Sequence, residues 1–301
     1  MTAPQDDAEA AAALPFAAID VGTNTTRLLV ARVAHGRVEP LVARSTMTAL
    51  GAGLHPGGDI GAEGLDLVEE TVRQMASEAH DLGARRLIIA CTAPARVAGN
   101  AAELLVRLHS ASGVAARVLS GEDEAQLAFR GIVASGAPDP LVAIDLGGGS
   151  LEIMSGDGGH LRWATSVPIG VRFLTERFTP SDPPAEALFE PMVAAVGEFL
   201  VSVTLPVVAN EAIATGGSAV ALARLAGSDL LDRDARARAG ERLVGSAAEV
   251  LAEETGLETA RVRLSLAGAA ALEAVRRTFG LDALRVSQAG IREGLVLEAA
   301  A

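Results

Sequence analysis

The sequence predicts an α/β fold of two domains, because short apolar segments typical of strands alternate with helical segments along most of the chain. Two segments carry this prediction best. Each is an apolar run that ends in an aspartate, Asp20 or Asp145, and continues through a glycine turn into a second apolar run. The repeated pattern, one copy in each half, indicates two related halves with mixed sheets. A chain of 301 residues is long enough to form both cores.

The first half of the chain reads as a hairpin followed by alternating helices and strands. An apolar residue recurs about every third or fourth position after Ile60, which predicts a helix that ends before Gly83. Ser120 and Asp123 have the spacing of a capping box. The expected elements are strands Phe16–Asp20 and Arg27–Val33, helix Ile60–Leu82, strand Arg86–Ala90, helix Asn100–Ser110, strand Ala116–Leu119 and helix Glu122–Val133.

A linker rich in glycine and proline, Gly136–Pro140, separates the halves. We expect a disordered, Ala-rich and acidic leader over residues 1–14, a first domain over 15–135 and a second over 136–301, whose last helix is free to pack back on the first domain. The second half should contain strands Leu141–Asp145, Leu151–Met154 and Leu161–Val167, helix Ser181–Val203, strand Ala212–Ala214, and helices Ala219–Leu225, Asp234–Glu254, Arg261–Phe279 and Gln288–Ala299.

Composition excludes several classes of function. The net charge of −13 argues against a nucleic-acid binder, and all 25 basic residues are arginine, so the chain cannot form the lysine-containing loop of P-loop NTPases. No apolar run approaches the length of about 20 residues that spans a bilayer. The single cysteine fits a reducing compartment. We therefore expect a cytoplasmic protein that contacts neither membranes nor nucleic acids.

The glycine turns are candidate phosphate sites. Three consecutive glycines, Gly147, Gly148 and Gly149, are costly in conformational entropy, and their expected use is close approach of the backbone to a ligand. Asp20 and Asp145 each end a buried strand, where an unpaired carboxylate is expensive. Binding of Mg²⁺ (or Mn²⁺) together with phosphate oxygens explains both acids. A third glycine turn, Thr215–Ser218, fits a structural and a functional interpretation equally.

Two further residues are candidates for phosphate chemistry. Glu124 lies in the first helical turn after Ser120, where acids are favoured by capping and by the helix dipole, but a general base for a hydrolytic water is the alternative. Arg96 follows a strand end, where a guanidinium can clamp phosphate. Four residues separate Cys91 from Arg96, whereas the loop of cysteine phosphatases needs five between its cysteine and arginine. Such a loop is therefore excluded, and Cys91 is expected to be a small buried apolar side chain.

The ordered set of motifs resembles the exopolyphosphatase / guanosine pentaphosphate phosphohydrolase (Ppx/GppA) family, from Phe16 to about Glu298. The motifs, in family order, are IDVGTNTTRLLV, ALGAGL, TAPARVAGN, LSGEDEAQLAFRG, AIDLGGGSLEI, PIGVRFLTERF, ATGGS and VSQAGIREGLVLE. The resemblance implies two actin-like (ribonuclease H-like) domains with an active site in the interdomain cleft, and a homodimer. It also implies metal-dependent release of orthophosphate from the end of inorganic polyphosphate.

The resemblance assigns roles to individual positions, matched motif by motif. The catalytic base is expected at Glu124, and the metal at Asp145 with Glu152 and Asp20. The substrate is expected to bind at the following residues: Gly22, Asn24, Thr25, Arg27, Arg96, Gly147, Gly148, Gly149 and Ser150.

Two positions depart from the family pattern. Val97 stands where the family usually has an aspartate, and Ala49 where a basic residue is common. Both changes remove polar character near the expected cleft and bear on affinity for long chains more than on the chemistry. Alternatives remain open: guanosine pentaphosphate as substrate, a non-catalytic phosphate or nucleotide sensor, and, with less support, a sugar or acetate kinase.

Overall fold

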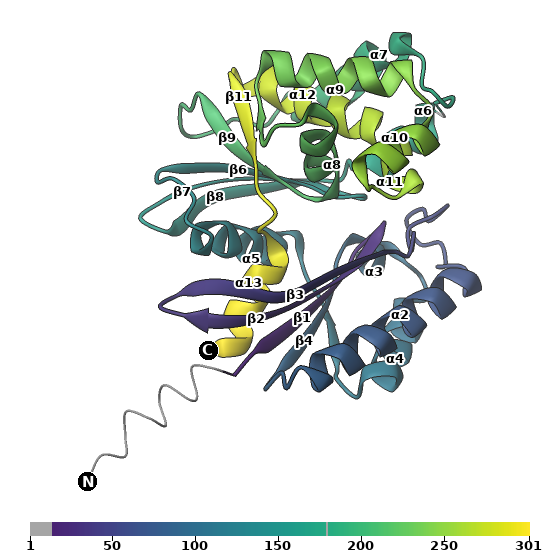
Figure 1. Ribbon diagram of the computed structural model, residues 1–301, viewed down its shortest axis with the longest axis vertical. Coiled ribbons are helices and arrows are strands. Elements are labelled where there is room, and N and C mark those ends of the chain that lie inside the picture. The colour runs from purple at the N-terminus through teal and green to yellow at the C-terminus, as the bar shows by residue number, and fades with distance from the viewer. Residues whose placement is uncertain (1–13, 179) are drawn as a thin grey trace. The chain divides into compact units, whose positions relative to one another are not determined.

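The computed structural model describes residues 14–178 and 180–301, which form two compact units (Figure 1). The first unit contains the chain up to Ala137 together with Ala289–Ala301, and the second contains Pro138–Gln288. The predicted leader, except for Leu14, lies outside the described residues. In the described part of the chain, no helix combines the length and the apolar character needed to cross a membrane.

The first unit contains a five-stranded mixed sheet with the strand order β3-β2-β1-β4-β5. Strands β1, β2 and β3 form an antiparallel meander, and β4 and β5 run parallel to β1. The strands are β1 (Phe16–Val21), β2 (Thr25–Ala34), β3 (Arg37–Met47), β4 (Leu87–Cys91) and β5 (Ala116–Val118), and the helices are α2 (Ala62–Asp81), α3 (Ala93–Val97), α4 (Ala101–Ser112), α5 (Gly121–Ala134) and α13 (Ile291–Ala300).

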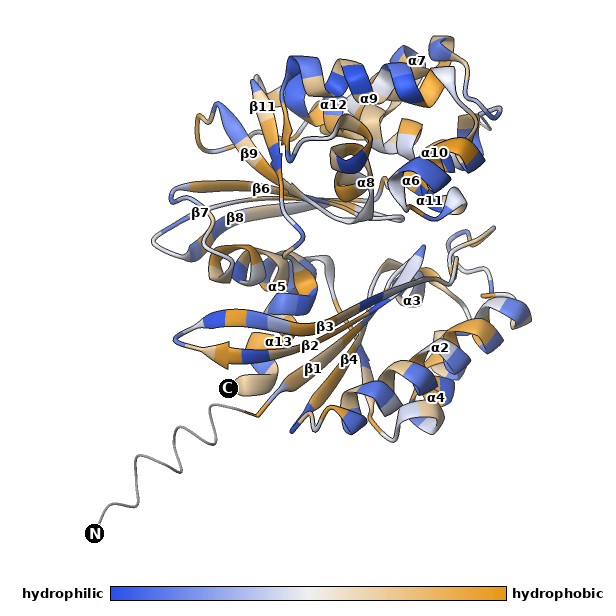
Figure 2. Ribbon diagram, viewed as in Figure 1, coloured by the Kyte–Doolittle hydropathy of each residue, from blue (hydrophilic) through white to orange (hydrophobic). Residues whose placement is uncertain are grey.

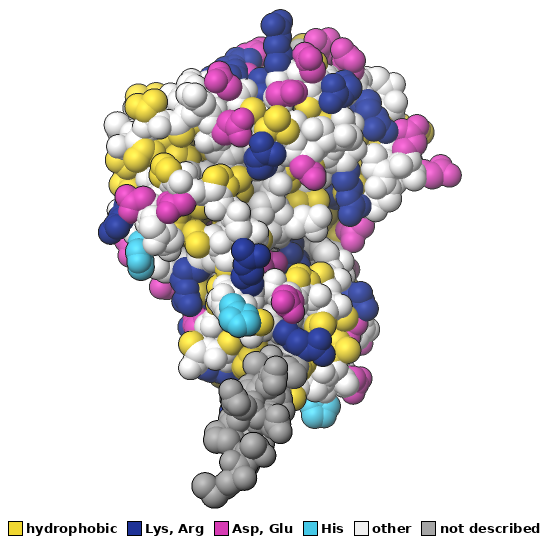
Figure 3. All heavy atoms as spheres, turned by 60° about the vertical axis from the view of Figure 1, so that its left-hand side comes forward, with side chains coloured by type: hydrophobic (Ala, Val, Ile, Leu, Met, Phe, Trp, Pro, Cys, Tyr) yellow, Lys and Arg dark blue, Asp and Glu magenta, His cyan; other side chains and the backbone are white. Residues whose placement is uncertain are grey.

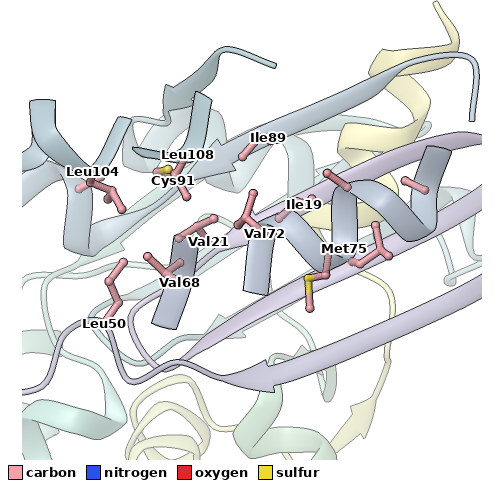
Figure 4. Close-up of a cluster of buried hydrophobic side chains, with 14 of the residues drawn as sticks. Ile19, Val21, Leu50, Val68, Val72, Met75, Ile89, Cys91, Leu104 and Leu108 are labelled. Carbon is pink, nitrogen blue, oxygen red and sulfur yellow. The ribbon is translucent and has the colours of Figure 1, made fainter. Parts of the chain in front are cut away.

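Alternating side chains of β1 supply cores on both faces of this sheet. Ile19 and Val21 join a cluster with α2 and α4, which Figure 4 shows around Val72 and Met75. Ala18 belongs to the cluster on the other face, which α5 and α13 cover. Because successive strand residues point to opposite faces, Asp20 lies on the face that α13 covers. The last helix of the chain therefore packs on the first unit.

The second unit repeats this plan with a six-stranded sheet, ordered β10-β11-β9-β6-β7-β8. Strands β6, β7 and β8 form the meander, and β9 runs parallel to β6. Its elements are β6 (Leu141–Leu146), β7 (Leu151–Asp157), β8 (His160–Val167), α6 (Val171–Phe178), the 3₁₀ helix η1 (Glu186–Leu188), α7 (Phe189–Leu200), β9 (Glu211–Thr215), α8 (Gly217–Ala226), β10 (Leu230–Leu231), α9 (Arg233–Gly245), α10 (Ala248–Thr255), α11 (Thr259–Arg263), α12 (Ser265–Phe279) and β11 (Ala283–Val286).

The α/β prediction is confirmed, and the hydropathy pattern explains it. Figure 2 shows apolar residues concentrated along the inner strands β1, β2 and β6, whereas the helices of the surface carry polar residues on one side. On the face drawn in Figure 3, acidic and basic side chains are interspersed. The net negative charge is therefore not gathered into one block on that face.

Several expected elements differ from those observed. The helix predicted over Asp234–Glu254 is two helices, because the chain turns at Ser246 and the Ala248 N–H donates to Asp182 Oδ1 at 2.7 Å. The helix predicted from Ser181 begins with η1 and continues as α7, and the helix predicted over Arg261–Phe279 divides at Leu264. Strands β3, β10 and β11 and helices α3 and α6 have no counterpart in the prediction.

Candidate functional site

The first glycine turn joins β1 to β2 and closes on its own backbone. The Gly22 N–H donates to Thr25 O at 3.0 Å. A second loop packs on the turn, since the Ala49 N–H donates to Asn24 O at 2.9 Å and the Gly51 N–H donates to Thr23 O at 2.8 Å. The ALGAGL segment thus braces the turn through its backbone. Asn24 and Thr25 are buried, whereas Gly22 is half-buried.

Asp20 is the buried acid of this turn. Its side chain is 7% exposed, and its Oδ1 accepts no hydrogen bond among the described residues. Burial raises the pKa of the Asp20 carboxyl, Arg27 and Arg292 lower it, and Glu293 raises it further. Arg27 stands directly opposite Asp20 on β2. Asp20 is therefore a carboxyl held in a poorly solvated place next to two cations of its own unit.

Arg292 is a site residue that sequence reasoning missed. It lies in the first turn of α13, on the sheet face to which Asp20 points. Burial lowers the pKa of its guanidinium, and the charges of Glu293 and Asp20 raise it. The segment AGIREGLVLE was part of the recognised pattern, and the last helix was expected to be free to pack back on the first domain, but no local pattern indicates that Arg292 would lie near Asp20. Only tertiary packing brings these residues together.

Glu124 and Arg96 form an ion pair in which the carboxylate is buried and the guanidinium half-buried. Arg96 Nη1 donates to Glu124 Oε1 at 2.5 Å and to Leu119 O at 2.9 Å. The side chain of Glu124 is 6% exposed and that of Arg96 is 24% exposed. Helix α3, which begins at the end of β4, presents Arg96, and the first turn of α5 presents Glu124. The structure therefore places Arg96, predicted to bind phosphate, in contact with Glu124, predicted to be the general base.

The acids around Glu124 have separate roles. Asp123 closes the predicted capping box, because it accepts from the Ser120 N–H at 3.2 Å and donates its own N–H to Ser120 Oγ at 3.1 Å. Hydrogen bonds from Ser120 lower the pKa of Asp123. Glu122 is exposed. Of the three acids, only Glu124 is buried, so capping accounts for Asp123 and leaves Glu124 available for another role.

Cys91 is fully buried at the end of β4, as predicted. Burial, with a smaller contribution from the negative charge of Asp20, raises the pKa of its thiol to about 12. The thiolate is the nucleophilic form of cysteine. Cys91 is therefore a thiol at neutral pH and acts as a small apolar side chain.

The second glycine turn joins β6 to β7 with the same closure as the first. The Gly147 N–H donates to Ser150 O at 3.0 Å. The start of α6 holds this loop from outside, since the Val171 N–H donates to Gly147 O at 3.2 Å and the Arg172 N–H to Gly148 O at 3.0 Å. A Cβ on Gly170 would lie 2.3 Å from the Gly148 backbone. The close packing explains why a glycine is needed at position 170.

Asp145 and Glu152 are direct partners across the antiparallel strands β6 and β7. Side chains in such positions project to the same face, with Cβ atoms about 4.5–5.5 Å apart. Glu152 is 3% exposed, and its Oε1 accepts from Ser166 Oγ on β8 at 2.7 Å. The second unit thus has two acids where the first unit has an acid and an arginine. Two neighbouring carboxylates are a fit for Mg²⁺, which takes one or two carboxylates plus phosphate oxygens.

The third glycine turn joins this site. Strand β9 pairs with β6, so that Thr215 stands beside Asp145. A Cβ on Gly216 would lie 2.4 Å from Leu146 O and 3.0 Å from Asp145 Oδ1, and Gly216 has a φ of +96°. The N-terminus of α8 follows at Gly217. Close packing and the positive φ are a structural reason for Gly216, while its place beside Asp145 suits a functional one, so both interpretations of Thr215–Ser218 stay open. The described residues contain no cluster of three or more metal-ligating side chains.

These features define a class: an α/β protein of two units, each with a hairpin whose glycine turn follows a strand that carries an acid near its end. The model of the Ppx/GppA phosphatase family matches residues 29–301, and the chain belongs to that family. It is accordingly a phosphoanhydride hydrolase.

Known relatives support the assignment. Exopolyphosphatase 1 of Mycobacterium tuberculosis (strain ATCC 25618 / H37Rv) is 30% identical over 297 residues, which cover 93% of this chain and 86% of the relative. The crystal structure of an exopolyphosphatase from Cytophaga hutchinsonii has a TM-score of 0.84 at 25% identity and covers 95% of this chain and 97% of its own. The structure of the Aquifex aeolicus PPX-GPPA enzyme has a TM-score of 0.77 at 26% identity, and the match covers 95% of this chain and 99% of the Aquifex chain. The two-domain α/β class is thereby confirmed as that of solved Ppx/GppA structures.

Proposed function

We propose that the chain is an exopolyphosphatase, which hydrolyses the terminal phosphoanhydride of inorganic polyphosphate and releases orthophosphate. The observation that carries the proposal is the Asp145–Glu152 pair beside the Gly147–Gly149 loop. Two acids on one strand face next to a backbone loop suit a metal-bridged phosphate better than a neutral ligand. The names of the relatives point to the same substrate.

In this proposal the glycine turns bind phosphate through the backbone. Both turns close through one backbone N–H, from Gly22 or Gly147, and the backbone of each turn would bind oxygens of the substrate. Asn24, Thr25 and Ser150 would add polar side-chain contacts. Arg27 stands on β2 opposite Asp20 and would orient its guanidinium towards the substrate's charge.

Asp145 and Glu152 would hold Mg²⁺ or Mn²⁺. The bound ion would supply charge stabilisation to the phosphate oxygens as the anhydride bond breaks. Ser166 fixes the Glu152 carboxylate by its hydrogen bond to Oε1, a contact that orients a ligand. Asp20 was predicted as a third metal ligand. Since Arg27 and Arg292 already place positive charge near it, we assign the ion to the Asp145–Glu152 pair.

Glu124 would act as the general base that accepts a proton from the attacking water. Its burial keeps bulk solvent away, and Arg96 fixes both its position and its charge. The guanidinium of Arg96 carries five N–H donors, and its contacts with Leu119 O and Glu124 leave some for a phosphate. Arg96 would thus link the base to the substrate.

The test is orthophosphate release from polyphosphate of graded length and from guanosine pentaphosphate, each with and without Mg²⁺. The proposal predicts release from polyphosphate that requires the divalent ion. Preference for guanosine pentaphosphate would replace polyphosphate as the substrate and leave the chemistry in place. Saturable binding of both compounds without release would instead support a sensor.

A further inference from the structure

The second unit contains a cavity of about 450 Å³ that the proposed hydrolysis does not use. Helices α8, α9 and α12 form most of its wall, with Phe189 and strands β10 and β11. Its interior is apolar, and the buried leucines of the lining are Leu222, Leu231, Leu243, Leu266, Leu272 and Leu284. A volume of this size is within the range of small-molecule sites, which combine apolar walls with a few polar groups.

Arg236 is the cation among the described residues that line this cavity, and the charged side chains around it already form ion pairs with one another. Glu273 is 8% exposed and accepts from Arg276 Nε at 2.8 Å, Arg276 Nη2 at 2.9 Å and Arg277 Nε at 2.7 Å. Arg236 reaches the same carboxylate only at 3.4 Å, through Nε. Three guanidiniums thus share one glutamate, and the ion pair of Arg236 is the longest of the three.

The remaining contacts of Arg236 are to neutral backbone oxygens. Its Nη1 donates to Leu231 O at 2.8 Å and to Asp282 O at 3.4 Å. The side chain is 23% exposed, so the charge sits at the edge of the apolar space rather than deep inside it. Burial lowers the pKa of Arg236, whereas the charges of Glu273 and Asp232 raise it.

We propose that this cavity binds a small amphipathic monoanion, a free carboxylate with an apolar tail. The carboxylate would accept hydrogen bonds from Arg236, and the tail would lie among the leucines. A charge-assisted contact at a half-buried guanidinium supplies orientation, and burial of the tail supplies most of the affinity.

Three acids of the described chain also line the cavity. Glu186 and Glu241 are exposed, where solvent and salt screen their repulsion of the anion. The charge of the buried Glu273 is offset by its ion pairs with Arg276 and Arg277.

The test is calorimetric titration of the whole protein with decanoate, decanol and decylamine, which share one tail. Saturable binding of decanoate, at least about tenfold tighter than that of decanol, is expected from a charge-assisted hydrogen bond. Equal affinity of decanol, tighter binding of decylamine, or no saturable binding of decanoate would overturn the proposal. The site lies within the second unit and does not depend on the proposed hydrolysis.

Two variants locate the site. Arg236→Met should weaken decanoate binding by about tenfold or more and leave decanol unchanged, whereas Arg233→Met, at an exposed position of the same helix, should change neither. Gly240→Leu should abolish binding of both, because a Cβ there meets no atom within 4 Å and the added side chain would fill the cavity. Leucine is also a better helix former than glycine, so this variant should fold. Undiminished decanoate binding by Gly240→Leu would contradict the proposed location.

Discussion

Asp145 and Glu152 face each other across β6 and β7 at the register position where Asp20 and Arg27 face each other across β1 and β2. The two hairpins share a turn closed by a hydrogen bond of 3.0 Å, from Gly22 to Thr25 and from Gly147 to Ser150. The duplicated plan therefore carries two different charge pairs. The acid of the first hairpin has a cation of the protein as its neighbour, whereas the second hairpin pairs two acids, where we propose that the metal ion binds.

Removal of either acid of the second hairpin should therefore change metal dependence. We expect Glu152→Gln to raise the Mg²⁺ concentration needed for half-maximal activity by about tenfold or more, in the range typical of lost metal-site contacts. Ser166→Ala should have a smaller effect in the same direction, because it removes only the hydrogen bond that orients Glu152. Activity of Glu152→Gln would be measured over a Mg²⁺ series, and an unchanged midpoint would remove Glu152 from the metal site.

The charge of Asp20 should lower stability at neutral pH. Because burial raises its pKa, the folded chain holds a proton that the unfolded chain releases above the ordinary value of 3.8. Stability is therefore highest at low pH with respect to this group, and falls as pH rises towards the raised pKa. We expect Asp20→Asn to raise the Tm at pH 8 by about 2–4 °C, equivalent to about 1 kcal/mol of stability. This increase in Tm should become smaller as the pH approaches 3.8.

Asp123→Asn is the matched control, because the pKa of Asp123 is shifted in the opposite direction to that of Asp20 and the Tm should change in the opposite direction. Hydrogen bonds from Ser120 lower the pKa of Asp123, so its contribution is present above 3.8 and is lost as pH falls. Its replacement should slightly lower the Tm at pH 8. Thermal melts of both variants from pH 4 to pH 8 measure the difference. A lower Tm for Asp20→Asn at pH 8 would contradict the assignment of Asp20 as a destabilising buried charge.

The glycine contact between α6 and the second turn should not tolerate a methyl group. A Cβ on Gly170 would meet the Gly148 carbonyl at 2.3 Å, so Gly170→Ala must displace the loop and should reduce activity and stability together. Gly197→Ala in α7 is the control, because a Cβ there meets no atom within 4 Å. It should stabilise the protein by about 0.5–1 kcal/mol and leave activity unchanged. Kinetics and melting of the two variants, side by side, test the packing.

The Arg96–Glu124 pair should show strong coupling in stability. Arg96→Met leaves the buried Glu124 carboxylate without its guanidinium, and removal of one partner from a buried pair costs about 3–5 kcal/mol. The double variant Arg96→Met/Glu124→Gln should regain much of this loss. Denaturant unfolding of both single variants and the double variant gives the coupling energy. Additive losses would show that the two side chains act independently.

Much of the architecture could be predicted from sequence, because each hairpin carries its own pattern of apolar residues and glycine. Asp145 and Glu152 belong to one hairpin, so their pairing follows from local register. Strand β3 was missed because Pro40 and several polar residues obscure its pattern, which is common for an edge strand. The site contacts of Gly170, Gly216 and Arg292 join segments far apart in the chain, and no local pattern specifies such contacts.

The most direct measurement is the turnover of Glu124→Gln on polyphosphate with Mg²⁺, compared with that of Glu122→Gln. Both substitutions remove a carboxylate from the same helical turn, but Glu124 is buried beside Arg96 and Glu122 is exposed. A general base contributes about 10²–10⁴-fold to the rate. We expect kcat of Glu124→Gln to fall by that factor and kcat of Glu122→Gln to stay near that of the unmodified chain. Near-normal turnover of Glu124→Gln would contradict the assignment of Glu124 as the base.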